Sequence, residues 1–496
     1  MVLSDSPAPP AHGPTIGGLA ALFGLKAGHF GSVPLAGIAA DNRKVHEGYA
    51  FFAMPGTKVD GAQFIPAAVA AGAIMVVGAA ERPADLDRMV HYIQTPDMRL
   101  ALSKSAAYFY PRQPERIVAV TGTAGKTSVA EFTRQIFSAC GRPAASLGTL
   151  GLIGPDGADY GALTTPDPIT LHKTLHQLSM DGITHLAMEA SSHGLDQARL
   201  DGVKLSAAGF TNLGRDHLDY HASVEEYFAA KLKLFEKLLP PKAPAIINFD
   251  GARGAEAAVA AEMAGRHAVT VGRNGADITL LNVTPHGFGQ EITYRYEAEE
   301  YTVHVPLMGT FQIENALVAA GFALALGETP EDVAKALGQL QGVPGRLERV
   351  GAFNRAPIFV DYAHKPEALS YALEALRPFV SGKLHVVFGC GGDRDPGKRL
   401  IMGRIAAQKA DVVVVTDDNP RSENPALIRA EVLEGCPDAF EIGDRAEAIR
   451  EAVMRLEPGD ALLIAGKGHE TGQIIGSEVH PFSDHDVARA AIEALT

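Results

Sequence analysis

The sequence has few cysteines, no tryptophan and no long apolar segment. Its 496 residues include three cysteines, Cys140, Cys390 and Cys436, which form no C-x-x-C pair and show no zinc-ligand spacing. This scarcity argues against a disulfide framework and suits a reducing compartment. No stretch reaches the roughly 18 uninterrupted apolar residues of a membrane-spanning helix, and the N-terminus lacks the basic segment of a signal peptide. We therefore expect a cytoplasmic protein.

Positive charge is also scarce. The chain has 44 Lys and Arg against 58 Asp and Glu, which gives a net charge of −14 at pH 7. This balance argues against a surface that coats nucleic acid, although a local basic pocket for an acidic ligand remains compatible with it. We expect small-molecule partners, no nucleic acid, no membrane insertion and a monomer.

The chain is long enough for three domains of about 150 residues each. Residues 1–14 are rich in Pro and Ala and are expected to be disordered. Junctions rich in proline or glycine lie at Pro111–Pro114 and Gly342–Gly345. They predict a small α/β domain at 15–113, a central domain at 114–344 and a last domain at 345–496. A helix is expected at Ile16–Leu25.

Short apolar runs alternate with helical segments, which predicts an α/β fold with parallel, doubly wound sheets. The alternation over Val269–Val305 suggests added antiparallel strands, and a helix is expected at Val224–Leu238. The principal strands predicted are 49–53, 73–77, 117–120, 184–188, 207–210, 245–248, 358–360, 385–388, 412–415 and 461–464.

The segment TGTAGKTS, residues 121–128, stands between a strand-like run and a helix-like segment, Val129–Cys140. Gly122 and Gly125 permit backbone conformations in which successive N–H groups close around phosphate oxygens. Lys126 adds a positive charge, and the hydroxyl of Thr127 can hold Mg²⁺. The loop is shorter than the standard phosphate loop, because Val120 stands where its first glycine would be. An ordinary turn containing Gly-Lys-Thr is the alternative, but a nucleoside triphosphate site is the better interpretation.

Two further segments follow predicted strands. Glu189 begins one of them, at the strand end where open α/β sheets often place a catalytic or metal-binding acid. The other, TNLGRDHLDYH, offers Asp216, His217, Asp219 and His221 as oxygen and nitrogen ligands for a hard cation. A polar surface loop remains the alternative for this second segment.

Lys231 falls on the apolar stripe of the predicted helix Val224–Leu238, whereas Lys233 and Lys237 fall on the opposite face. One interpretation is that its aliphatic stem packs on the core while the ammonium reaches water. The other is that burial lowers its pKa and leaves a neutral amine, which could form a carbamate with CO₂.

The last domain begins with Arg346, Asp361 and His364 near the second junction, where two domains closing on a nucleotide could use them. Taken alone, the arginine and the histidine are better explained as surface or core residues.

Further along, Arg394 and Arg421 offer rigid donor forks for carboxylates, and Asp418 and Asn419 can accept from an ammonium group. Gly466, which allows close backbone approach, and Glu470 follow the last predicted strand. An amino acid with an extra carboxylate would suit this set. A turn rich in Asp, Asn and Pro for local reasons is the alternative, and it explains Asn419-Pro420.

Taken in order, these motifs resemble the Mur ligase family, which adds amino acids to the UDP-linked peptide precursor of bacterial peptidoglycan. The matching motifs are TGTxGKT, SSHGL, NLxRDHLDYH, AAK, GRLE, VDYAH, GDRD, DNPR and GKGHE. They extend over nearly the whole chain after the first dozen residues. The resemblance implies a small UDP-binding α/β domain, a central P-loop ATPase-like domain with a mostly parallel sheet, and a Rossmann-like doubly wound C-terminal domain.

The resemblance is to the member that adds the third residue of the peptide, meso-2,6-diaminopimelate, to UDP-N-acetylmuramoyl-L-alanyl-D-glutamate. It implies an ATP-dependent, ADP-forming ligase that works with Mg²⁺ through an acyl phosphate, in cell-wall synthesis. Arg421 in DNPR would grip the distal carboxylate of diaminopimelate, because lysine-adding relatives lack this arginine. A lysine-adding ligase, a folylpolyglutamate synthase, a P-loop switch and a binding protein that has lost catalysis remain the alternatives.

The resemblance also implies roles for individual residues. Lys126, Glu189, His217 and Lys231 would be catalytic, and Mg²⁺ would be held by Thr127, Glu189, His217 and Lys231 as a carbamate. ATP would be bound by Gly122, Thr123, Ala124, Gly125, Lys126, Thr127, Ser128, Asn315, Arg346, Asp361 and His364. The UDP-linked precursor would be bound by Asn42, Thr57, Thr164, Thr165, Ser191, Gln197 and Arg199. Diaminopimelate would be bound by Arg394, Asp418, Asn419, Pro420, Arg421, Gly466 and Glu470. The chain departs from the family pattern at Ala124 and Gln312, where asparagine is usual, and at Asn42, where serine is more typical.

Overall fold

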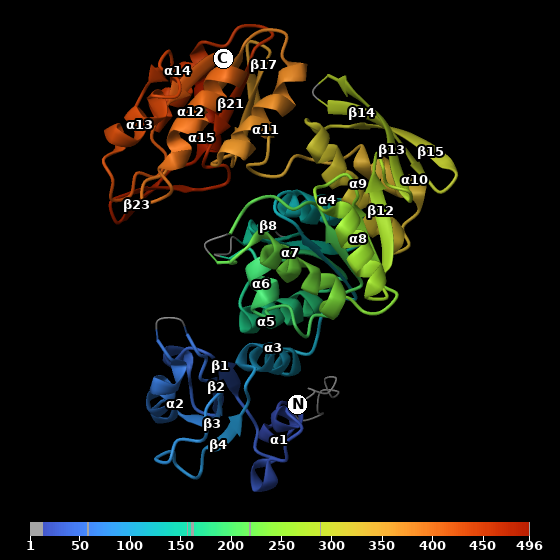
Figure 1. Cartoon of the computed structure of the whole chain (residues 1–496), viewed down its shortest axis with the longest axis vertical. Coiled ribbons are helices and arrows are strands. Elements are labelled where there is room, and N and C mark those ends of the chain that lie inside the picture. Colours follow the sequence, from blue (N-terminus) through green and yellow to red (C-terminus); the bar gives the residue numbers. More distant parts are fainter. Residues whose placement is uncertain are drawn as a thin grey trace. The chain divides into compact units, whose positions relative to one another are not determined.

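The computed structural model describes residues 13–56, 59–155, 157–159, 163–217, 220–287 and 289–495 (Figure 1). The expected disorder of residues 1–12 and the site residues Thr57 and Asp219 lie outside these ranges. The described chain forms two compact units. The first runs to Asp277 and also contains Val318–Thr329, and the second contains Ile278–Leu317 and continues from Pro330. Within the described ranges, no helix combines the length and apolar character needed to cross a membrane.

The N-terminal part of the first unit is built on a parallel four-stranded sheet. Its strands, in spatial order, are β1 (Gly37–Ala39), β2 (Tyr49–Phe52), β3 (Ala73–Gly78) and β4 (His91–Gln94). Helices α1 (Ile16–Ala21) and α3 (Met98–Phe109) pack on one face, and α2 (Ile65–Ala70) packs on the other. Short 3₁₀ segments lie at Gly28–Phe30, Asn42–Lys44 and Gly61–Phe64.

The helix expected at Ile16–Leu25 is shorter than predicted. It ends at Ala21, and the chain then turns through Gly24, whose φ of 68° lies in the left-handed region. Apolar periodicity continues past the helix because Leu22 and Phe23 are buried in the same core from the turn. The apolar pattern therefore predicts correctly which residues are buried, but it does not predict where the helix ends.

The central part of the first unit has β5 in the middle of a larger sheet. In spatial order the strands are β12 (His267–Gly272), β11 (Pro244–Asn248), β10 (Ala207–Phe210), β5 (Arg116–Thr121), β9 (His185–Glu189), β6 (Ala144–Gly148), β7 (Gly151–Gly154) and β8 (Gly157–Asp159). The run from β12 to β6 is parallel. Because β5 pairs with β9 on one side and β10 on the other, the loops after these three strands leave the same edge of the sheet.

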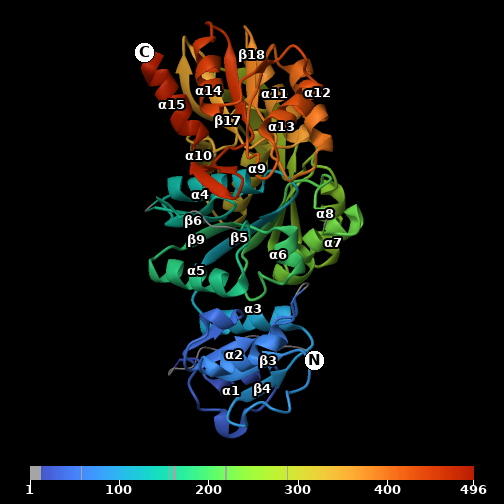
Figure 2. The same ribbon diagram turned by 90° about the vertical axis from the view of Figure 1, so that its left-hand side faces the viewer.

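Helices cover both faces of this sheet. Figure 2 shows α4 (Lys126–Ala139) and α5 (Pro168–Met180) on opposite sides of β5, β6 and β9. The strand residues Ile117 and Ala119 share a core with Leu171 and Leu175 of α5. The other helices of this part are α6 (Ser192–Asp196), α7 (Val224–Lys233) and α8 (Gly254–Met263).

The helix expected over Val224–Leu238 changes character within that range. It is α-helical from Val224 to Lys233 and continues as a π-helical turn over Leu234–Leu238. Leu234 and Phe235 are both fully buried, although one α-helical stripe cannot hold two consecutive residues at its centre. The wider turn lets both side chains enter the core.

The second unit starts with an antiparallel meander of β13 (Ile278–His286), β14 (Gly289–Tyr296) and β15 (Glu299–Val305). The expected antiparallel strands within Val269–Val305 are therefore present. The start of that range is the exception, because β12 pairs with β11 in parallel. Helix α9 (Thr310–Ala325) follows, although its residues from Val318 onward belong to the first unit, and helix α10 (Pro330–Leu337) returns to the second unit.

The last part of the second unit is a doubly wound α/β fold, as predicted. Its strand order is β16 (Glu348–Phe353), β17 (Ala356–Asp361), β21 (Ala461–Ala465), β18 (Leu384–Phe388), β19 (Val412–Val415) and β20 (Phe440–Glu441), and only β16 runs antiparallel to its neighbour among these described strands.

Helices α11 (Pro366–Leu376), α12 (Gly397–Lys409) and α13 (Pro425–Leu433) pack on one face of this sheet (Figure 2). Helices α14 (Arg445–Met454) and α15 (Asp484–Leu495) pack on the other. A 3₁₀ turn at Arg377–Phe379 follows α11, and a hairpin of β22 (Gly472–Ile475) and β23 (Glu478–Pro481) follows β21. The segments after β17, β18, β19 and β21 leave the carboxyl edge of the sheet, where such folds bind ligands.

Candidate active site

The phosphate-loop segment forms the turn between β5 and α4. Gly122 and Gly125 have φ of 151° and 86°, in the region that favours glycine. A Cβ at position 122 would clash with Oγ1 of Thr211. Thr127 and Ser128 are buried in the first turn of α4. The loop therefore places its backbone at a helix N-terminus, as the sequence predicts.

The segment after β10 clamps this loop. Oγ1 of Thr211 donates to the carbonyl of Ala124 at 2.6 Å, and N–H of Ala124 donates to Oδ1 of Asn212 at 3.0 Å. N–H of Gly214 donates to Oγ1 of Thr123 at 2.8 Å. Sequence reasoning assigned no role to Thr211 or Asn212. Their position directly after a strand that neighbours β5 was the available signal.

Two amino groups converge on one carbonyl of the loop. Nζ of Lys126 donates to the carbonyl oxygens of Gly122 at 2.9 Å and Thr123 at 3.0 Å. Nζ of Lys231 donates to the same Gly122 carbonyl at 2.7 Å. Lys231 is 1% exposed, so the interpretation that its ammonium reaches water is wrong.

The environment of Lys231 favours its neutral form. Burial, followed by the nearby charge of Lys126, holds its pKa well below the usual range of a lysine. Its Nζ also lies 4.3 Å from the centroid of the Tyr227 ring. The expected burial of this lysine on the apolar face of α7 is confirmed, and a buried amine of low pKa can react with CO₂.

Glu189 ends β9 and is 1% exposed. Its Oε1 accepts from N–H of Thr149 at 2.7 Å, and its Oε2 accepts from Oγ1 of Thr149 at 3.3 Å. Glu189 lines a small cavity together with Thr127, Glu131 and Ser146. Two of the predicted Mg²⁺ ligands, Thr127 and Glu189, are therefore close together.

Most residues assigned to the UDP-linked precursor form a network with Glu189. Oγ1 of Thr165 donates to the carbonyl of Glu189 at 3.0 Å and accepts from N–H of Ser191 at 3.1 Å. Nη1 of Arg199 donates to the carbonyl of Thr165 at 2.7 Å, and its Nη2 donates to Oε1 of Gln197 at 2.8 Å.

Thr164 joins the same network through Thr149, whose Oγ1 lies 3.0 Å from its own. Asn42 lies elsewhere, at the start of a 3₁₀ turn capped by Asp41. The structure thus brings five of the seven assigned residues together beside the predicted catalytic carboxylate.

His217 has a φ of 53°, and its side chain is 44% exposed. Its Nε2 lies 3.6 Å from Oδ2 of Asp216, and its ring centroid lies 4.8 Å from that of His193. Among the described residues, no group of three or more His, Cys, Asp or Glu is placed to hold a metal ion. Mg²⁺ normally takes only one or two carboxylates and completes its shell with water and phosphate oxygens.

In the second unit, Gln312 links two of the residues assigned to ATP. Nδ2 of Asn315 donates to Oε1 of Gln312 at 3.3 Å, and Nε2 of Gln312 donates to the carbonyl of Arg346 at 3.2 Å. Gln312, which lies on α9, therefore contacts Asn315 on the same helix and Arg346 in the segment before β16.

Asp361 and His364 complete this cluster. Oδ2 of Asp361 accepts from N–H of Leu347 at 2.7 Å, and burial raises its pKa to about 6. Nδ1 of His364 donates to the carbonyl of Tyr362 at 2.8 Å, and burial lowers the pKa of this histidine to about 4. The guanidinium of Arg346 lies over the Tyr362 ring, 5.1 Å from its centroid.

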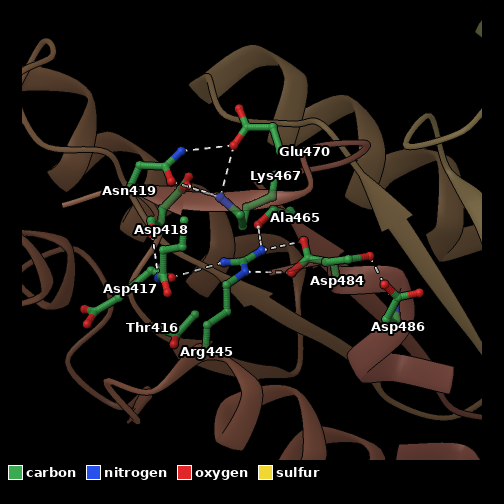
Figure 3. Close-up of polar contacts among 12 residues, drawn as sticks. Thr416, Asp417, Asp418, Asn419, Arg445, Ala465, Lys467, Glu470, Asp484 and Asp486 are labelled. Carbon is green, nitrogen blue, oxygen red and sulfur yellow. Dashed lines mark hydrogen bonds and ion pairs between the residues drawn. The ribbon is translucent and has the colours of Figure 1, made fainter. Parts of the chain in front are cut away.

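The residues assigned to the amino acid gather after β18, β19 and β21. Nδ2 of Asn419 donates to Oε2 of Glu470 at 3.0 Å (Figure 3). Nζ of Lys467 donates to the same Oε2 at 3.0 Å and to Oδ1 of Asn419 at 3.0 Å, and it lies 3.7 Å from Oδ1 of Asp418. Sequence reasoning missed Lys467. The signal for it was a lysine between two glycines directly after a buried strand.

Two arginines approach one glycine in this region. A Cβ at Gly391 would lie 2.9 Å from Nη1 of Arg421 and 3.9 Å from Cγ of Arg394. Nη1 of Arg421 donates to the carbonyl of Gly392 at 2.8 Å, whereas Arg394 is exposed. Pro420 is buried, and its carbonyl lies where a Cβ of Gly392 would be. The segments that follow β18 and β19 therefore pack tightly against each other, and each carries an arginine.

Asp418 lies beside a buried ion pair that the sequence did not reveal. A Cβ at Gly466, whose φ is 120°, would lie 3.1 Å from Oδ2 of Asp418. Burial raises the pKa of Asp418, and the charges of Arg445 and Lys467 oppose that shift. Nε and Nη2 of Arg445 donate to Asp484 at 2.7 and 2.8 Å, and Nη2 also donates to the carbonyl of Ala465 (Figure 3).

Replacing Asp484 by alanine is expected to lower the free energy of unfolding of the second unit by about 3–5 kcal/mol, because it leaves the Arg445 charge buried and unpaired. Urea unfolding followed by circular dichroism measures this loss. Glu300→Ala, which removes the partner of the half-exposed Arg295, is the matched control and should cost far less. Equal losses in the two variants would contradict the role of the buried pair.

Three family models match successive segments of the chain. The chain matches the family models described as Mur ligase family, catalytic domain, at residues 34–110, Mur ligase middle domain at 120–323, and Mur ligase, glutamate ligase domain, at 345–468. It is 56% identical to the UDP-N-acetylmuramoyl-L-alanyl-D-glutamate--2,6-diaminopimelate ligase of Bradyrhizobium diazoefficiens, over 93% of this chain and 95% of that protein. It is 54% identical to the protein of the same name from Rhizobium meliloti, over 94% and 96%.

A solved structure of a ligase with that name superposes with a TM-score of 0.72 at 34% identity, and covers 94% of this chain and 96% of that one. The resemblance drawn from the motifs is therefore confirmed, and with it the expected α/β architecture. The chain belongs to the Mur ligase family.

Proposed function

We propose that this enzyme joins meso-2,6-diaminopimelate to the side-chain carboxylate of D-glutamate in UDP-N-acetylmuramoyl-L-alanyl-D-glutamate, using ATP, in peptidoglycan precursor synthesis. The observation that carries the proposal is the cluster in which Arg394 and Arg421 approach Gly391 beside Asp418, Asn419 and Glu470. Diaminopimelate carries two carboxylates and two ammonium groups. Arginine forks suit its distal carboxylate, and buried carboxylates suit an ammonium group. Relatives named for this reaction are 47–56% identical over nearly the full chain.

ATP is assigned to residues 122–128, where the loop meets the N-terminus of α4. The D-glutamate carboxylate attacks the γ-phosphorus of ATP, and the bond from this phosphorus to the β-phosphate oxygen breaks. The products are ADP and an acyl phosphate. An amine of diaminopimelate then attacks the acyl carbon, loses a proton and expels phosphate, which forms the amide. Lys126 would neutralise charge that develops on the phosphates, and Asn315, Arg346, Asp361 and His364 would contact the nucleotide.

Mg²⁺ would be held by Thr127, Glu189, His217 and a carbamate on Lys231, and it would supply positive charge that screens the phosphates. The residues suit this role because Thr127 and Glu189 line one small cavity and supply oxygen ligands. His217 is assigned from its place in the family motif.

The carbamate on Lys231 rests on the buried position of its amine. A neutral amine adds to CO₂, loses a proton and becomes a carbamate, which turns a positive group into a negative one. The buried amine of this lysine and its lowered pKa favour the neutral form that reacts. The new charge would offset that of Lys126, which otherwise faces a second amino group at the same carbonyl.

The UDP-linked precursor is assigned to Thr164, Thr165, Ser191, Gln197 and Arg199, together with Asn42 and Thr57. The hydrogen-bond network that joins the first five to Glu189 supports a precursor whose peptide end lies near the phosphates. The enzyme would act in the cytoplasm as a monomer, and its three free thiols suit that compartment.

The purified protein with ATP, Mg²⁺ and the UDP-linked dipeptide is expected to release phosphate only after diaminopimelate is added. A coupled phosphate assay, with diaminopimelate and L-lysine compared singly and in competition, measures this dependence. Omission of the dipeptide is the control for simple ATP hydrolysis. Equal turnover with lysine would contradict the proposed amino acid, and phosphate release without any amino acid would instead favour an NTPase.

A further inference from the structure

Lys467 has no exposed surface, although it lies among the polar groups of the amino-acid site. It follows β21, and its Nζ donates to Oδ1 of Asn419 and to Oε2 of Glu470 at 3.0 Å each and forms an ion pair with Oδ1 of Asp418 at 3.7 Å (Figure 3). A buried ammonium is costly unless it is paired. These acceptors are therefore the structural reason for a lysine at this position.

Asn419 connects Lys467 to the β22–β23 hairpin. Its Oδ1 accepts from Nζ of Lys467 and also from N–H of Ile474, at 2.9 Å. Its Nδ2 donates to Glu470. Because one end of the amide faces two donors and the other faces a carboxylate, the orientation of the side chain is determined by its partners. Nε2 of Gln473 donates to the carbonyl of Asp418 at 2.7 Å and adds a second contact between the hairpin and this motif.

Ile474 extends this connection to the backbone of Arg421. The carbonyl of Ile474 accepts from N–H of Arg421 at 3.1 Å, and N–H of Gly476 donates to the carbonyl of Arg421 at 2.8 Å. Arg421 has a φ of 50°, a left-handed conformation that a residue with a Cβ rarely adopts. Its surroundings must therefore hold it, and the hairpin bonds both of its backbone groups.

We propose that Lys467 is a positioning residue that, through Asn419 and the β22–β23 hairpin, holds Arg421 in the geometry that receives the distal carboxylate of the amino acid. Lys467 has no surface through which to touch the substrate, so it acts on specificity only through these neighbours. Because the distal carboxylate belongs to diaminopimelate, this role rests on the proposed function.

Lys467→Met keeps the unbranched stem of the side chain and removes the terminal ammonium with its charge and its donors. KM for diaminopimelate is expected to rise about tenfold or more, as is typical when a supporting hydrogen-bond partner is lost. KM for ATP and for the UDP-linked dipeptide should stay within about twofold, and the preference for diaminopimelate over lysine should fall. Steady-state kinetics with each substrate varied in turn measures this split.

The matched control is Asp460→Asn. Asp460 precedes the same strand, β21, at its opposite end, and its Oδ2 lies 3.1 Å from Nε2 of His385 in a buried pair. The substitution also weakens a buried polar contact in this fold, but far along the strand from Arg421. It should lower Tm while leaving the KM for diaminopimelate unchanged.

Ile474→Pro tests the same connection without changing the buried lysine. Proline removes the N–H that donates to Oδ1 of Asn419. Position 474 is partly exposed on the β22–β23 hairpin, so the substitution does not disturb the core. It should raise the KM for diaminopimelate selectively, as Lys467→Met does, so the role remains testable even where Lys467→Met folds poorly.

These experiments distinguish failure of the proposed function from failure of the positioning role of Lys467. A wild-type enzyme that releases no phosphate on addition of diaminopimelate would overturn the proposed function. An active wild-type enzyme whose Ile474→Pro and Lys467→Met variants keep their KM for diaminopimelate would overturn the positioning role alone. A rise in the KM for ATP in the same proportion would also overturn it, because that pattern indicates general disruption of the fold.

Discussion

Replacing Lys231 by alanine is expected to lower kcat by about 10²- to 10³-fold, the scale of losing one charged group aimed at a transition state. Nζ of Lys231 donates to the carbonyl of Gly122 in the phosphate loop, and Nζ of Lys126 donates to the same carbonyl. A carbamate there would place negative charge next to the phosphates and help to hold Mg²⁺. The coupled phosphate assay, with diaminopimelate and the dipeptide at saturation, measures the loss.

Chemical rescue distinguishes a carbamate from a merely structural lysine. The alanine variant leaves space where the side chain was, so acetate or another short carboxylic acid should restore part of the activity by supplying the missing carboxylate. Wild-type enzyme in ¹³C-labelled bicarbonate should show a carbamate carbon in its NMR spectrum, and the variant should not. Lys237→Ala, an exposed lysine in the next turn of the same segment, is the matched control. Full activity of Lys231→Ala would contradict the carbamate proposal.

The position of Lys231 could be predicted from the amino-acid sequence because the relevant pattern is local. Helical periodicity places this residue on the apolar face of α7, and the structure confirms its burial. The phosphate loop was predictable for a related reason, since strand, glycines, lysine and helix follow one another within a short stretch. The positions of Glu189 and Arg421 were predictable as well, because Glu189 ends a recognisable strand and Arg421 lies in the segment that follows another.

Residues whose partners are distant in the sequence were not predictable in the same way. Arg445 is paired with Asp484, 39 positions away, and only the packing of α14 beside α15 brings the two together. Lys467 meets Asn419, 48 positions earlier, because β21 and β19 end at the same edge of the sheet. Nothing in the local pattern of a Gly-Lys-Gly segment indicates which acceptors it will find. The doubly wound sheet itself was predictable, whereas these contacts across it were not.

Local patterns also misjudged where elements end. The apolar stripe of α7 continues past Lys233, but the helix widens into a π turn that buries both Leu234 and Phe235. The first helix stops at Ala21, although Leu22 and Phe23 remain in the core. In both places the hydrophobic pattern reports burial, and tertiary packing decides the backbone conformation that achieves it.

Replacing Arg421 by alanine is expected to reduce the discrimination between diaminopimelate and lysine by a factor on the order of 10⁴, because a site built to bind a charged group rejects an analogue that lacks it by about that much. Nη1 of Arg421 is already bonded to the carbonyl of Gly392. Among the described residues, its Nη2 and Nε make no hydrogen bond, which leaves a donor fork for a carboxylate. With lysine as substrate, that fork would be desolvated without a partner.

The left-handed backbone at position 421 requires a second variant. Alanine at a φ of 50° is strained, so a loss in Arg421→Ala could reflect the backbone as well as the guanidinium. Asparagine tolerates this conformation, and Arg421→Asn removes the fork without that strain. Both variants should raise the KM for diaminopimelate, leave the KM for ATP unchanged and accept lysine comparatively better. Arg455→Ala, a partly exposed arginine at the end of α14, is the control and should keep the full preference. A preference that survives in Arg421→Asn but falls in Arg421→Ala would assign the effect to the backbone, and selection by the guanidinium would then be wrong.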